Sequence, residues 1–300
     1  MAISFALSEI VALSAESFFY GIYAVLFCLS LKVLLKKRKF IPASKAFIVL
    51  AFVFGVLISW HVITDAVRLV FAFKFSQVPA GGADLYYFNA AATLSIVKTS
   101  IYLVTTVLFD FFILYRCWIV WDHNYLIVLL PALAFLADIG TGIASIIQLS
   151  EVSLSSDSVF LAKQERVTKS FFSATLATNG LCTLLIAYRV WTRQRAMRDS
   201  RAAFNLTKES AIMAESGAIY SVNLIIVVST YARQNNAFNV FLDMATPIIG
   251  VAFALIIIRI NAHINDAATQ ISMKRMNDAD ESGRGSMIKD DHPPVADNHV

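Results

Sequence analysis

Residues 98–121, KTSIYLVTTVLFDFFILYRCWIVW, form a long apolar stretch whose only charged side chains are Lys98, Asp110 and Arg116. At about 1.5 Å of rise per residue, a helix between Lys98 and Arg116 matches the roughly 30 Å of hydrocarbon in a bilayer. We therefore expect a transmembrane helix with these two bases near opposite interfaces. Asp110 then falls at lipid depth, where exposing a charge to lipid costs about 3 kcal/mol or more. We expect Asp110 to face neighbouring helices.

The composition is that of a polytopic membrane protein whose main partner is the lipid bilayer. Of 300 residues, 58% are hydrophobic and 15% are charged, far from the balance of a soluble domain. The net charge of +4 comes from bases clustered in particular loops, so it reports membrane orientation and requires no nucleic-acid partner. The cysteines, Cys28, Cys117 and Cys182, lie in or at the end of apolar segments. They offer neither a disulfide framework nor a metal-ligand spacing.

Seven segments are long and apolar enough to predict transmembrane helices, which together form an all-α bundle. They cover about residues 10–35, 46–73, 94–120, 125–149, 171–191, 211–230 and 238–260. We expect this membrane domain to comprise residues 1–265. Residues 266–300 are expected to form a cytoplasmic tail, with a short interfacial helix followed by a disordered segment that is poor in apolar residues.

The distribution of basic residues predicts the orientation of the bundle. With seven spans, the loops after the first, third and fifth spans share one side of the membrane with the C-terminus. Most loop bases fall on that side, above all in residues 36–39 and 189–208. By the positive-inside rule, the N-terminus is expected outside and the C-terminus in the cytoplasm. We expect the plasma membrane, with an endomembrane as the alternative.

Several charged residues fall within the predicted spans towards the outside of the membrane. They are Glu16, His61, Asp65, Arg68, Lys98 and Asp243. His61, Asp65 and Arg68 follow the spacing i, i+4 and i+7 within one span, which places them on one helical face. One interpretation is a ligand pocket between helices that opens to the outside. The alternative is ion pairing that only fixes helix packing.

A second set of charged residues falls towards the cytoplasmic side. It comprises Asp110, Arg116, Glu215 and Arg259, with Asp138 near the middle of the membrane. The functional interpretation is a two-state switch where a cytoplasmic partner docks. The alternative is that Arg116 and Arg259 extend their charged ends to the interface, which requires no function.

No complete catalytic or metal-binding constellation is predicted. His61 and Asp65 could be half of a metal or proton site, but zinc takes three or four ligands. The other histidines lie at predicted helix ends or in the tail: His123, His263, His292 and His299. We therefore interpret His61 as a structural residue paired with Asp65, and we expect no metal, no cofactor and no enzymatic activity.

Residues 115–121 (YRCWIVW), 255–260 (LIIIRI) and 19–23 (FYGIY) are the most distinctive motifs, together with the spacing of Lys98 from the first of them. In these motifs the chain resembles the uncharacterised seven-helix membrane proteins that are abundant in mushroom-forming fungi. The likeness covers nearly everything except the tail. It implies seven spans and an N-terminus outside, and it transfers no activity.

A wider resemblance, to G protein-coupled receptors, rests on the seven-span topology and on Arg116 at the cytoplasmic end of the third span. Tyr115 stands where the main receptor class has an acid, and residues 246–250 (TPIIG) stand in place of an NPxxY motif. The resemblance implies signalling through a cytoplasmic protein.

The sequence thus favours receptor-like sensing of a small or lipidic ligand through the outer charged residues. The alternative is a transporter or lipid-handling protein that uses Asp65, Asp110 and Asp138 as a relay. No inverted repeat of the kind common in transporters is visible.

Overall fold

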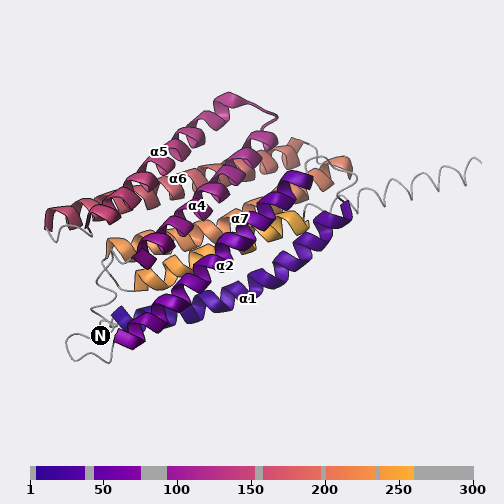
Figure 1. Cartoon of the computed structure of the whole chain (residues 1–300). Coiled ribbons are helices and arrows are strands. Elements are labelled where there is room, and N and C mark those ends of the chain that lie inside the picture. The colour runs from indigo at the N-terminus through magenta and orange to yellow at the C-terminus, as the bar shows by residue number, and fades with distance from the viewer. Residues whose placement is uncertain are drawn as a thin grey trace, which may run out of the picture. The chain divides into compact units, whose positions relative to one another are not determined.

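The computed structural model describes residues 5–37, 44–75, 93–152, 158–196, 201–233, 235 and 237–259. All regular structure in these ranges is α-helical. The helices are α1 (Phe5–Lys37), α2 (Ser44–Phe75), α4 (Thr93–Val120), α5 (Tyr125–Val152), α6 (Ser158–Ala196), α7 (Arg201–Ala232) and a helix from Ala237 to Arg259, called the 237–259 helix below (Figure 1). The predicted tail, residues 266–300, lies outside the described residues.

Six of these helices are long and apolar enough to cross a bilayer, which indicates an integral membrane protein. They are α1, α2, α4, α5, α6 and the 237–259 helix. In α7 the apolar part is shorter, Gly217–Ala232. The predicted all-α architecture is confirmed, and the six long apolar helices agree with a membrane bundle. The count of seven spans and the orientation stay predictions.

Helix α6 begins at Ser158, well before the predicted start near residue 171. Residues 163–170 of this helix, KQERVTKS, are mostly polar, and they interrupt the apolar pattern from which a transmembrane span is predicted. Ion pairing four residues apart supports the helix there, since Lys169 Nζ lies 2.6 Å from Glu165 Oε1. The helix therefore runs without a break through this polar segment into the apolar part that follows it.

A tight turn reverses the chain between α4 and α5. Asp122 and His123 adopt the left-handed conformation, with φ of 51° and 64°. The Asn124 side-chain oxygen then accepts a hydrogen bond of 3.1 Å from the Leu126 backbone N–H and caps the start of α5. This turn explains why so short a polar segment can connect two antiparallel helices.

Helix α4 lies at the centre of the described bundle. It packs against α2 on one side and against α5 and α6 on the other (Figure 1). Aromatic rings connect α4 to α7 and the 237–259 helix: the Phe109 and Tyr220 ring centroids lie 5.2 Å apart, and those of Phe112 and Phe253 lie 5.0 Å apart. The charged residues of α4 are therefore surrounded by other helices.

The 237–259 helix approaches α1 and α2 closely at Gly250. A β-carbon added there would lie 2.5 Å from both a Tyr23 ring carbon and the Ile58 Cδ1 atom. Small residues allow such close approach between membrane helices, and the contact area gained stabilises the bundle. This approach brings the acid of the 237–259 helix, Asp243, next to the charged residues of α2 and α4.

Candidate functional site: a buried ion-pair network beside a cavity

Lys98 of α4 forms ion pairs with two carboxylates from two other helices. Its Nζ atom lies 2.7 Å from Asp65 Oδ1 of α2 and 2.7 Å from Asp243 Oδ1 of the 237–259 helix. The three residues are 7%, 5% and 1% exposed. A buried charge requires such partners because hydrocarbon does not solvate it. Lys98 therefore connects three helices through one ammonium group.

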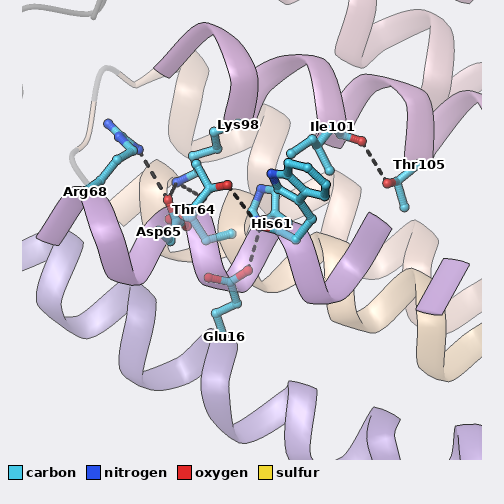
Figure 2. A network of polar contacts seen from close by, with 10 residues as sticks. Glu16, His61, Thr64, Asp65, Arg68, Lys98, Ile101 and Thr105 are labelled. Carbon is cyan, nitrogen blue, oxygen red and sulfur yellow. Dashed lines mark hydrogen bonds and ion pairs between the residues drawn. The ribbon is translucent and has the colours of Figure 1, made fainter. Parts of the chain in front are cut away.

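The same network extends along α2 to α1, and Figure 2 shows it from close by. Arg68 donates a hydrogen bond of 3.3 Å to Asp65 Oδ1, so Asp65 lies between Arg68 and Lys98. His61 Nδ1 lies 2.6 Å from Glu16 Oε1 of α1. The structure thus brings together the outer charged residues that the sequence singled out, in what we call the outer network: Glu16, His61, Asp65, Arg68, Lys98 and Asp243.

The predicted partner of His61 was wrong. We expected Asp65, four residues further along the same helix, whereas the hydrogen-bond partner is Glu16. Sequence spacing shows only which residues share a helical face, and Glu16 reaches His61 through the packing of α1 against α2.

The sequence predicted no metal site here because it offered only two ligands, His61 and Asp65. The fold brings a third possible ligand, Glu16, close to them. One ligand atom each from Glu16, His61 and Asp65 lies within 4.8 Å of the others. Two cations, Lys98 and Arg68, already contact Asp65, and their charge opposes a further cation at that carboxylate. We therefore treat this trio as part of the ion-pair network.

A cavity of about 220 Å³ adjoins the outer network. Lys98, Asp243 and His61 line it on the network side. Its other walls come from α4, α5, α6, α7 and the 237–259 helix, and aromatic side chains dominate them: Tyr102, Phe171, Phe172, Tyr231 and Phe238. Ligand sites typically combine such apolar walls with a few polar groups. The cavity therefore has the composition of a small-molecule site.

The aromatic walls of the cavity are packed ring against ring. Tyr231 and Phe238 have centroids 4.6 Å apart, and Phe172 lies 5.9 Å from the first ring and 5.7 Å from the second. No sequence motif distinguishes these residues. Aromatic residues in an apolar span give no signal that separates a cavity wall from a packed core.

A larger hollow of about 640 Å³ lies between α1 and α2, but it differs in character. Phe52 and Trp60, which line it, are 60% and 58% exposed on the outside of the bundle. In a membrane such surfaces contact acyl chains. We therefore place the candidate ligand site at the smaller cavity beside the outer network.

Two further acids are buried deeper along the bundle. Asp110 of α4 and Asp138 of α5 have no exposed surface and interact electrostatically with each other. The Thr175 hydroxyl donates a hydrogen bond to Asp138. Neither Asp110 oxygen has a hydrogen-bond partner within the described ranges. Asp110 thus faces other helices, as the cost of lipid exposure requires.

The residues predicted to form a cytoplasmic switch are described only in part. The Arg116 guanidinium lies 5.3 Å and 5.2 Å from the ring centroids of Phe47 and Phe112. Arg259 is half-buried near the end of its helix. The side chain of Glu215 lies outside the described part of the chain. The switch therefore stays a prediction.

Long apolar helices with their charged groups buried between them define this chain as a helical integral membrane protein. No protein-family model matches it, and no curated protein or solved structure resembles it significantly. The likeness to a fungal seven-helix family therefore stays a prediction.

Proposed function

We propose that this protein is a receptor-like membrane protein that binds a small or lipidic ligand in the cavity beside the outer network. The observation that carries the proposal is that Lys98 and Asp243 belong both to the wall of the cavity and to the outer network. They line the cavity, and they also pair with each other between two helices. A ligand that contacts either residue competes with an ion pair that fixes helix packing. Binding would then change the relative stability of two helix arrangements, as ligand-driven signalling requires.

In this proposal the N-terminus is outside, and the cavity takes its ligand from that side. The signal reaches the cytoplasm at the opposite ends of α4 and α6. Arg116 lies at that end of α4, and Arg189 and Arg195 lie at that end of α6. A basic surface of this kind suits an acidic face of a cytoplasmic partner.

The test is a thermal-shift screen of chemically diverse small molecules against the purified protein. Compounds that raise the melting temperature should lose their effect in Ser145→Phe, because Ser145 is buried and lines the cavity. The matched control is Ala144→Phe, which adds the same ring at an exposed neighbouring position. Hits that bind both variants equally well would place the ligand elsewhere, and a screen without hits would oppose a ligand-binding role.

A transporter is the second candidate, and the acid pair of Asp110 and Asp138 favours it. Both are fully buried, and hydroxyl groups of Tyr102 and Tyr220 interact with Asp110. A relay through these groups would give pH-dependent flux in proteoliposomes, and Asp110→Asn would abolish that flux. Absence of any flux in the wild-type protein would rule this candidate out.

A further inference from the structure

We propose that the ligand of the cavity is a small organic cation: an amine that carries one aromatic ring or an apolar group of similar size. This inference rests on the proposed function, because it names the chemical class of the ligand for that same cavity. Three independent properties of the cavity support it: the charge beside it, the polar atoms left unpaired in it, and its size and aromatic walls.

The formal charge of the outer network favours a cation. With histidine counted as neutral at pH 7, the network holds three carboxylates, Glu16, Asp65 and Asp243, and two cations, Arg68 and Lys98. In this formal count the carboxylates outnumber the cations by one. An anionic ligand would approach the Asp243 carboxylate that lines the cavity, whereas a cationic ligand would pair with it.

Two of the polar atoms left unpaired at the cavity are carboxylate and amide oxygens, and a third, the Tyr102 hydroxyl, can donate or accept. Asp243 Oδ2 and Gln164 Oε1 are buried and have no hydrogen-bond partner among the described residues, and both residues line the cavity. The nitrogen donors beside these two oxygens already have partners: Lys98 Nζ contacts two carboxylates, and Gln164 Nε2 donates to Thr168 at 3.4 Å. Buried acceptors without donors are costly, and an ammonium group supplies up to three donors.

The aromatic walls suit the same ligand. Tyr231, Phe172 and Phe238 present adjacent rings to the cavity, and ring faces attract ammonium groups. Tyr231 already interacts with a cation in this way, since Lys169 Nζ lies 6.0 Å from its ring centroid. The same walls offer apolar contact to the uncharged part of a ligand.

The size of the cavity sets the size of the ligand. An apolar cavity of about 150 Å³ holds benzene, so the cavity of about 220 Å³ has room for one ring with a short amine-bearing chain. A bare metal ion would leave most of this space empty and its aromatic walls unused. We therefore choose 2-phenylethylamine as the probe.

The experiment compares three probes that share the same ring and differ in charge. They are 2-phenylethylamine, the neutral 2-phenylethanol and the anionic phenylacetate, each titrated against the purified full-length protein by calorimetry. One charge-assisted hydrogen bond corresponds to a difference of about 10- to 100-fold in affinity. We expect the amine to bind tighter than the alcohol by that factor and phenylacetate to bind most weakly.

Substitutions then test which residue recognises the amine. Asp243→Asn should remove the preference for the amine over the alcohol, because it removes the charge but keeps the shape of the side chain. Gln164→Leu, which leaves the ion pairs intact, should weaken amine binding several-fold. Glu165→Gln is the control, because it neutralises an acid next to Gln164 on α6 that does not line the cavity. This variant should keep the preference for the amine over the alcohol.

The outcomes separate this inference from the proposed function. Equal or tighter binding of the alcohol or of phenylacetate would overturn the assignment to amines. If none of the three probes binds but another compound binds and is blocked by Ser145→Phe, the amine assignment falls and the ligand-binding cavity stands. If no compound of any class binds, both fall.

Discussion

Replacement of Lys98 by Met tests the outer network most sharply, because it removes a charge and nearly preserves side-chain length. Lys98 Nζ contacts both Asp65 Oδ1 and Asp243 Oδ1 at 2.7 Å, and all three side chains are at least nine-tenths buried. Without Lys98, Asp65 keeps its contact with Arg68 at 3.3 Å. Asp243 keeps no ion pair among the described residues. Removing one partner of a buried ion pair costs about 3–5 kcal/mol of folding free energy, and we expect a loss in that range.

A double variant separates lost charge from lost packing. In Lys98→Met/Asp243→Leu, the carboxylate that the first change leaves unpaired is removed as well. The double variant should therefore be more stable than Lys98→Met alone, with a favourable coupling of about 1–3 kcal/mol. The measurement is the unfolding free energy in mixed micelles, from titration with a denaturing detergent. A single variant that loses less than about 1 kcal/mol would refute the reasoning, since that is the range of a solvent-exposed ion pair. So would a double variant whose losses simply add.

Three further predictions concern packing, thiol exposure and orientation. Gly250→Val should lower the free energy of unfolding by about 1–3 kcal/mol, because the valine side chain would overlap Tyr23 and Ile58. The control is Gly21→Ala, which has no neighbour within 4 Å and should leave the melting temperature nearly unchanged. Cys28 is exposed only on the apolar outer surface of α1 and the other two cysteines are buried, so a water-soluble maleimide should modify the folded protein slowly and all three thiols rapidly after denaturation. A glycosylation reporter at the N-terminus should be modified in cells, and one between α6 and α7 should not; the reverse pattern would overturn the predicted orientation.

Much of the helical architecture could be predicted from the sequence, because lipid imposes a simple length and polarity rule on each span. The burial of Asp110 followed from the same rule, since a charge in a long apolar segment must avoid lipid, whereas Lys98 was expected near an interface and is only 7% exposed. The first part of α6 was missed, because its polar residues 163–170 interrupt the apolar pattern on which the rule depends.

The contacts between helices could not be predicted to the same degree. The sequence placed His61 and Asp65 on one face of α2, but the proximity of Glu16 and Asp243 to that face depends on how α1 and the 237–259 helix pack. The same limit applies to Cys117 and Cys182, which interact across α4 and α6 although nothing in their spacing suggests it. Packing between helices depends on side-chain shape, which a single sequence does not reveal.

The central claim is that buried charges from several helices meet at Lys98 and form one wall of a ligand cavity. An experimental density map of the protein in a lipid nanodisc tests it most directly. The predicted result is density for the Lys98 side chain between the carboxylates of Asp65 and Asp243, with a cavity of about 220 Å³ beside it. A Lys98 side chain that points to the lipid, or helices that separate the two carboxylates, would contradict the account.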